Sequence, residues 1–227
     1  MEDAFLIDYA VLKSEMTPSE VYSACQEGVK LGVRTLCVNP CHLEMLSSLV
    51  AGAKTKLCPV TDFPFGSSSS AAKAAQIMLA ANFEDVLEVD VVANYGLLRA
   101  GKMDEFIEDL EMCADACHEA GKELKVILET DALTLEQIAA GCEASVEAGV
   151  DFVKTSTGFY TGACPRGVAE GASEEVVKLM LDTVKGQAKV KASGKIRTRE
   201  QFLKLKALGV ARMGIGYGSV KACLGVE

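Results

Sequence analysis

Two lysines and two aspartates occur inside short, valine-rich segments, where charged side chains are costly to bury. Lys154 and Lys191 each follow a valine in a β-rich run. Asp90 stands between two valines, and Asp8 ends the first such run. Burial and a second nearby cation both lower the pKa of a lysine, and a neutral amine is the form that attacks a carbonyl to make a Schiff base. A neighbouring carboxylate can transfer protons during carbon–carbon bond cleavage. These residues therefore predict Schiff-base chemistry, provided that the fold brings them together.

Less specific features leave alternatives open. The lysines and aspartates could form buried ion pairs that only close one end of the fold. Glu129 ends a later β-rich run, where it could polarise a catalytic group or pair with Lys125. Gly214 and Gly216 follow the last β-rich run and could let backbone N–H groups approach an anion at a helix N-terminus, although a tight turn explains them as well. The acidic partner expected of a dinucleotide-binding Gly-x-Gly is not evident, which disfavours NAD.

The elements that must position these residues alternate along the whole chain. Eight strands are predicted at residues 5–8, 34–38, 56–60, 86–91, 124–129, 152–155, 188–192 and 212–215. Eight helices are predicted after them, at residues 18–31, 40–51, 69–82, 103–120, 134–148, 173–184, 199–208 and 217–224. Capping signals support the helices: Thr17 precedes a proline at the first helical position, and Thr134 begins a capping-box pattern with Gln137. Four glycines stand where helices should close, at positions 32, 121, 149 and 209.

Eight strand–helix units in 227 residues predict a single α/β domain, a (β/α)8 TIM barrel over residues 1–227. The alternative is an open, doubly wound parallel sheet. In a barrel the active site forms where the strands end at their carboxyl side. Alternate residues of a strand share one face, so Lys154 should point inward with Phe152, and Asp90 should face away from its flanking valines.

Composition excludes several functional classes. Lys and Arg number 23 against 32 Asp and Glu, which gives a net charge of −9, and no basic block occurs. Nucleic acids and anionic membranes are therefore not expected as partners. No segment approaches the ~18 consecutive apolar residues of a membrane span. Asp3 and Asp8 interrupt the first apolar stretch, so no signal peptide is expected.

Nine cysteines without a Cys-x-x-Cys pair predict reduced, mostly buried thiols in a cytoplasmic protein. Two Cys-x3-Cys pairs, Cys37/Cys41 and Cys113/Cys117, each precede a histidine, so a zinc site is an alternative. Packing of small side chains one helical turn apart is the preferred interpretation of both pairs.

Lys-Thr-Ser-Thr-Gly-Phe at residues 154–159 resembles the deoxyribose-phosphate aldolase family, whose members are class I aldolases with a (β/α)8 fold. The resemblance spans nearly the whole chain. Further matching segments are Ile-Asp-Tyr-Ala-Val-Leu-Lys at 7–13, Cys-Val-Asn-Pro at 37–40, Phe-Pro-Phe-Gly at 63–66, Glu-Val-Asp-Val-Val-Ala-Asn-Tyr-Gly at 88–96, Leu-Lys-Val-Ile-Leu-Glu-Thr at 124–130 and Lys-Ala-Ser-Gly at 191–194.

The resemblance implies a role for each matching residue. Lys154 would form the Schiff base, Asp90 and Lys191 would relay protons, and Asp8 would support that pair. The residues expected to bind substrate are Thr155, Gly158, Gly194, Lys195, Gly214 and Gly216. The implied reaction is the reversible cleavage of 2-deoxyribose 5-phosphate to glyceraldehyde 3-phosphate and acetaldehyde, without a metal or an organic cofactor.

Three departures from the family's pattern bear on the substrate. Tyr9 and Ala10 replace a His-Thr pair, Lys195 replaces a glycine, and Ile-Gly-Tyr at 215–217 replaces a hydroxyl-rich turn. The last two changes fall where the family binds phosphate, and we expect Lys195 to supply a cation in place of the lost hydroxyls. Two other functions stay open: a related aldolase for a different aldehyde or ketose, phosphorylated or not, and a non-catalytic barrel that binds a sugar phosphate. A homodimer is also compatible with the sequence.

Overall fold

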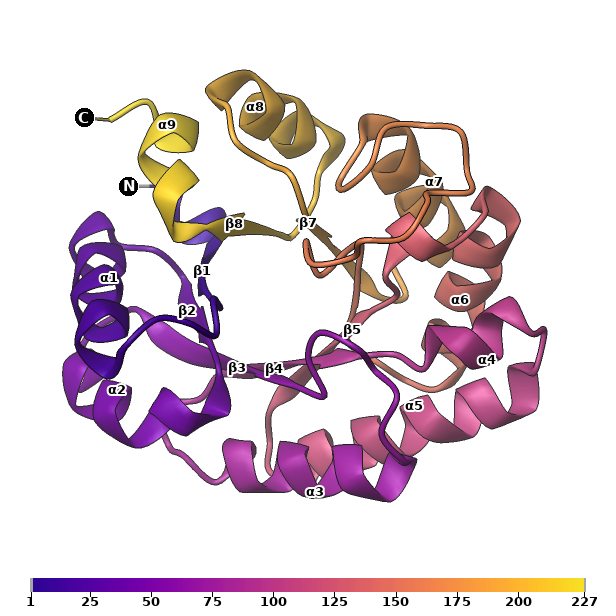
Figure 1. Ribbon diagram of the computed structural model, residues 1–227, viewed down its shortest axis with the longest axis horizontal. Coiled ribbons are helices and arrows are strands. Elements are labelled where there is room, and N and C mark those ends of the chain that lie inside the picture. Colours follow the sequence, from indigo (N-terminus) through magenta and orange to yellow (C-terminus); the bar gives the residue numbers. More distant parts are fainter. Residues whose placement is uncertain (1, 227) are drawn as a thin grey trace.

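Eight parallel strands close into one barrel in the computed structural model, which describes residues 2–226 (Figure 1). The strands are β1 Ile7–Val11, β2 Thr35–Val38, β3 Lys56–Thr61, β4 Glu88–Val92, β5 Glu123–Ile127, β6 Phe152–Lys154, β7 Lys189–Ser193 and β8 Arg212–Gly216. Each strand pairs with the next in sequence, and β8 pairs with β1. The predicted (β/α)8 barrel is therefore confirmed, and the open-sheet alternative is wrong. The predicted domain bounds, residues 1 and 227, lie outside the described residues.

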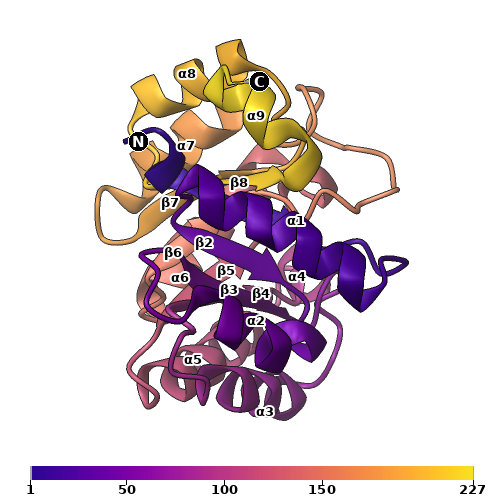
Figure 2. The ribbon, with the colours of Figure 1, turned by 90° about the vertical axis from the view of Figure 1, so that its left-hand side faces the viewer.

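Helices form a ring outside the strands (Figure 1), and Figure 2 shows α1, α2 and α3 following one another along one side of the barrel. Their bounds are α1 Pro18–Leu31, α2 Leu43–Val50, α3 Ser70–Ala81, α4 Tyr95–Arg99, α5 Met103–His118, α6 Leu135–Glu147, α7 Glu174–Val184, α8 Arg199–Leu208 and α9 Val220–Leu224. Between residues 2 and 226 we find no helix that is both long and apolar enough to cross a membrane.

The main hydrophobic core lies between strands and helices, and the inside of the barrel is charged. Val89 and Val91 of β4 belong to the core, whereas Glu88 and Asp90 are buried on the other face of the same strand. Side chains alternate across a strand, so the valines that pack on the helices also fix which residues face the barrel axis. The inward orientation predicted for Asp90 follows from this packing.

The predicted capping signals of the helices are present. Thr17 and Glu20 form a complete capping box before α1, and Thr134 and Gln137 form another before α6. The four predicted closing glycines, at positions 32, 121, 149 and 209, all have the positive φ that glycine adopts without steric cost.

Several predicted boundaries are wrong, and these shifts matter for the site. Residues 4–6 form a 3-10 turn and β1 continues to Val11, so Asp8 is its second residue and not its end. Strand β5 ends at Ile127, which leaves Glu129 beyond it in a left-handed conformation with φ 56°. Cys37 lies on β2, so the helical packing predicted for Cys37 and Cys41 is also wrong. A charged residue does not mark the end of a strand, because backbone pairing continues or stops independently of the side chain.

Candidate active site

Three of the predicted residues meet at one carboxylate inside the barrel. Lys154 and Lys191 occupy paired positions of β6 and β7, and Asp90 lies in the middle of β4. The Nζ atoms of the two lysines lie 2.8 and 2.7 Å from the same oxygen, Oδ2 of Asp90. All three residues are buried, so these ion pairs are shielded from water. The structure thus brings together the nucleophile and proton relay that the sequence predicts.

Asp8 is fully buried and does not line the cavity described below. Its Oδ2 is 2.6 Å from Lys191 Nζ, and its Oδ1 accepts a hydrogen bond from the Thr35 hydroxyl at 2.8 Å. It contacts Lys191 and not Lys154 within hydrogen-bonding distance, which fits the supporting role that the resemblance implies.

Lys125 belongs to the site although its sequence motif did not predict this. It pairs in register with Asp90 on β4 and is fully buried. Its Nζ lies 3.2 Å from Asp90 Oδ1 and 3.6 Å from Asp8 Oδ2, and it forms an ion pair with Glu88. The alternative pairing of Lys125 with Glu129 is therefore wrong. The alternation Leu-Lys-Val-Ile at 124–127 carries the signal, because it places Lys125 on the inward face.

These charges set the protonation of the buried groups. Burial raises the pKa of Asp90, but the attraction of Lys154, Lys191 and Lys125 outweighs it and holds that pKa well below its usual range. Asp8 is shifted in the same direction, because Lys191 and Lys125 outweigh its burial. Burial lowers the pKa of Lys191, yet Asp8 and Asp90 more than reverse this, so its pKa is raised. The expectation that a second cation leaves the lysines neutral is therefore wrong for Lys191.

A cavity of about 440 Å³ opens above these ion pairs. Of the predicted residues it is lined by Lys154, Lys191, Gly158, Gly194, Lys195, Gly214 and Gly216. Thr155 is not among its lining residues, because its hydroxyl donates to the Ser193 carbonyl at 2.6 Å and accepts from the Ser193 N–H at 2.8 Å. A Cβ added at Gly214 would lie 3.2 Å from Lys191 Cε and 2.7 Å from Ser193 Oγ, so glycine there leaves room for the lysine.

Lys195 lines the cavity but already has a partner. Its backbone has φ 58°, which fits a position where the family has glycine, and its half-exposed ammonium forms an ion pair with Glu170. Lys13 and Arg197 also line the cavity, and neither forms an ion pair with any residue between 2 and 226. No sequence pattern marks these two cations, because each stands alone in a polar loop.

Glu129 holds one wall of the cavity in place. Its Oε2 accepts hydrogen bonds from the Thr157 N–H at 3.3 Å and from the Thr157 hydroxyl. Burial raises the pKa of Glu129. Thr157 and Phe159 line the cavity, and the Phe159 ring packs edge-on against Phe63 at 5.3 Å. Glu129 therefore positions the turn that follows Lys154.

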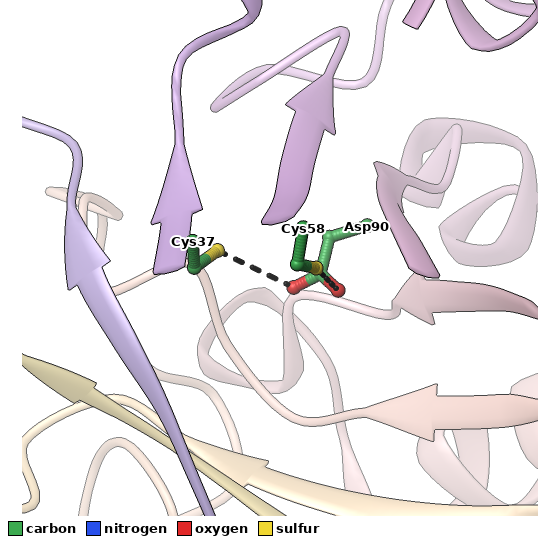
Figure 3. A group of neighbouring side chains, drawn as sticks. All are labelled: Cys37, Cys58 and Asp90. Carbon is green, nitrogen blue, oxygen red and sulfur yellow. Dashed lines mark hydrogen bonds between the residues drawn. The ribbon is translucent and has the colours of Figure 1, made fainter. Parts of the chain in front are cut away.

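Cys37, Cys58 and Asp90 form a cluster whose side chains all point toward one another (Figure 3). Their donor atoms lie within 4.8 Å of one another, as a metal site would require. Three ammonium groups already surround Asp90, however, and a divalent cation would be repelled by all of them. The predicted zinc alternatives, with His42 or His118, are not among the metal-like clusters of the part of the chain described. The donor set does not fit a metal.

Residues 5–218 match the family model described as "DeoC/LacD family aldolase". The chain belongs to this family. It is 40% identical to a deoxyribose-phosphate aldolase from Carboxydothermus hydrogenoformans over 95% of this chain and 91% of that protein. It is 39% identical to a deoxyribose-phosphate aldolase from Finegoldia magna over 93% of this chain and 94% of that protein. Its structure matches the tetrameric deoxyribose phosphate aldolase from Aeropyrum pernix with a TM-score of 0.86 and 25% identity, over 99% of this chain and 90% of that one.

Proposed function

We propose that this aldolase-family protein reversibly cleaves 2-deoxy-D-ribose 5-phosphate to D-glyceraldehyde 3-phosphate and acetaldehyde through a Schiff base on Lys154. The observation that carries the proposal is the convergence of Lys154 and Lys191 on one oxygen of Asp90, directly below the cavity. Two lysines that only stabilised the fold could each pair with a separate carboxylate, and they would not have to meet at one oxygen beside a cavity. The names of the relatives supply the substrate.

Charge explains why Lys154, and not Lys191, is the nucleophile. Four buried or half-buried cations face three carboxylates inside the barrel: Lys125, Lys154, Lys191 and Arg212 against Asp8, Glu88 and Asp90. One ammonium can therefore lose its proton without leaving a carboxylate unpaired. Lys191 holds both Asp8 and Asp90, whereas Lys154 has Asp90 as its one carboxylate partner among residues 2–226. A neutral Lys154 therefore gives up one ion pair, whereas a neutral Lys191 would give up two.

The reaction begins when neutral Lys154 Nζ attacks the aldehyde carbon of the open-chain sugar. Asp90 lies 2.8 Å away and can accept the proton that the amine releases, and Lys191 can donate one to the departing hydroxyl. Loss of water gives a protonated imine, which withdraws electrons from the adjacent carbon–carbon bond.

Cleavage follows when the 3-hydroxyl of the sugar loses its proton. Electrons of the C2–C3 bond move into the imine, glyceraldehyde 3-phosphate leaves, and an enamine of acetaldehyde remains on Lys154. Protonation of its terminal carbon and hydrolysis release acetaldehyde and the free amine. The Asp90–Lys191 pair supplies and removes these protons without a metal.

The phosphate lies, in this proposal, at the edge of the cavity formed by Gly194, Lys195, Arg197 and Gly216. Backbone N–H groups beside the glycines and nearby cations suit an anion. Lys195 must exchange Glu170 for the phosphate, which weakens its contribution relative to a free cation.

An aldehyde-release assay tests the function directly. We expect acetaldehyde from 2-deoxyribose 5-phosphate, with a higher kcat/KM than for 2-deoxyribose. A preference for the unphosphorylated sugar would support the alternative aldolase function. Binding of the phosphorylated sugar without any turnover would support the non-catalytic alternative.

We also propose a homodimer that acts in the cytoplasm. The exposed apolar side chains of Met78, Leu79 and Met112 on α3 and α5 favour assembly, and all nine cysteines are free, seven of them buried. Sedimentation at micromolar concentration should give the mass of a dimer, and a monomer or tetramer would contradict this.

A further inference from the structure

Cys37 and Cys58 are two buried thiols at the catalytic carboxylate for which the proposed reaction has no use. They occupy paired positions of neighbouring strands β2 and β3. Cys58 Sγ lies 3.1 Å from Asp90 Oδ1, and Cys37 Sγ lies 4.0 Å from Asp90 Oδ2 (Figure 3). Both sulfurs therefore contact the carboxylate that Lys154 and Lys191 share.

The geometry allows a bond between the two sulfurs. Neighbouring strands lie about 4.8 Å apart, inside the range of Cα separations of about 4.4–6.8 Å that a disulfide spans. Side chains that point into a barrel converge toward its axis, which brings the two thiols closer than the backbones. The two sulfurs already lie within 4.8 Å of each other.

An oxidant can reach Cys37 through the cavity. Cys37 lines the cavity, whereas Cys58 lies behind it and is fully buried. The hydrogen bond with Cys58 has the largest effect on the pKa of the Cys37 thiol. Together with the attraction of Lys191 and Lys154 it lowers that pKa, although burial and the charge of Asp90 act in the opposite direction. Burial raises the pKa of Cys58 well above its usual value, so Cys58 keeps its proton. The accessible thiol is thus the more nucleophilic one.

We propose that Cys37 and Cys58 form a reversible disulfide that inactivates the site. Hydrogen peroxide, entering through the cavity, transfers one oxygen to the sulfur of the Cys37 thiol, which gives a sulfenic acid and one water. The Cys58 thiol then attacks the sulfenic sulfur, which forms the sulfur–sulfur bond and releases a second water. The net reaction converts two thiols and one peroxide into one disulfide and two waters.

The disulfide changes what Asp90 contacts. Asp90 Oδ1 loses its contact with Cys58 and keeps only Lys125, and the sulfurs move away from the carboxylate. Without the Cys58 contact Asp90 is held less firmly against Lys154 and Lys191, and we expect turnover to fall by about 10²-fold, the effect of losing a general acid–base group. The effect on turnover rests on the proposed function, whereas the cross-link does not.

Peptide mapping of the full chain after peroxide treatment is the test. Remaining thiols are alkylated, the chain is digested without reductant, and activity is measured on the same samples. We expect a cross-linked peptide pair containing Cys37 and Cys58, a lost fraction of activity that equals the cross-linked fraction, and recovery of both on adding dithiothreitol. If the chain has no aldolase activity before oxidation, the proposed function fails, and the peptide pair alone still decides whether the disulfide forms.

Two variants make the test specific. Cys58→Ser should give no cross-link and should leave a Cys37 sulfenic acid that dimedone labels. Cys41→Ser removes an exposed cysteine outside the cavity and should behave as the wild type. Oxidation confined to Cys41, or complete cross-linking of Cys37 to Cys58 with unchanged turnover, would overturn the proposal.

Discussion

Two buried lysines, Lys73 and Lys154, have opposite surroundings. Lys73 packs between α3 and α5, where its Nζ lies 2.7 Å from Asp109 and 4.0 Å from Asp62, so carboxylates outnumber the ammonium. Lys154 shares a single carboxylate oxygen with Lys191, and a cavity reaches it. Burial alone therefore does not mark a lysine for chemistry. A lysine is marked for chemistry when cations outnumber carboxylates around it and a cavity gives a substrate access to it.

Replacing the two lysines by methionine separates these roles and gives the largest expected effect. Lys154→Met should lower kcat by about 10⁴-fold or more, because no other amine replaces the nucleophile. Lys73→Met should lower the free energy of unfolding by about 3–5 kcal/mol, since it leaves Asp109 buried without its cation. Turnover per folded molecule, measured beside urea unfolding, should survive in the Lys73 variant. Equal losses of turnover in both variants would remove the distinction.

The next largest effects are expected for the two proposed relay residues. Asp90→Asn and Lys191→Leu should each lower kcat by about 10²-fold or more, because each removes a group that transfers protons. Steady-state kinetics on variants with wild-type circular dichroism checks this. Near-normal turnover in a folded variant would make that residue structural.

The pH profile of the Lys125→Met variant tests whether the cations around Asp90 control its protonation. Lys125 helps to hold the pKa of Asp90 down, so its removal should raise that pKa and move the acid limb of kcat/KM to higher pH. A group whose pKa is lowered in the folded state loses its stabilising effect as the pH falls, so acid unfolding should also begin at higher pH. An unchanged acid limb would mean that Lys125 only fills the barrel.

The smallest effect concerns Lys195. Lys195→Ala should raise KM for the phosphorylated sugar by about 3–10-fold and leave the unphosphorylated sugar nearly unaffected, because Glu170 competes for the ammonium. Glu170→Gln serves as the matched variant and should lower KM for the phosphorylated sugar. Equal changes for both sugars would reject a contact with phosphate.

The sequence predicts the barrel and the cluster of Asp90, Lys154 and Lys191, because both depend on patterns within short segments of the chain. Alternating strands and helices with clear caps define the order of the elements, and valines beside Asp90 and Lys154 define their inward faces. These patterns need no knowledge of which residues pair across strands.

The parts that could not be predicted depend on that pairing. The alternation at 124–127 turns Lys125 inward, but its contact with Asp90 depends on the register between β4 and β5. The partner of Lys195 comes from the long 155–173 loop, which has no periodic pattern that fixes where Glu170 lies. The position of Asp8 within β1 depends on pairing with β2 and β8.

Reductive trapping tests the central claim most directly. The wild-type chain is incubated with acetaldehyde and borohydride, digested, and mapped by mass spectrometry. We predict a single ethyl group on Lys154 and none on Lys191 or Lys73, because Lys154 lines the cavity and has the fewest carboxylate contacts of the cations around Asp90. An ethyl group confined to Lys191, or no adduct on any buried lysine, would contradict the account.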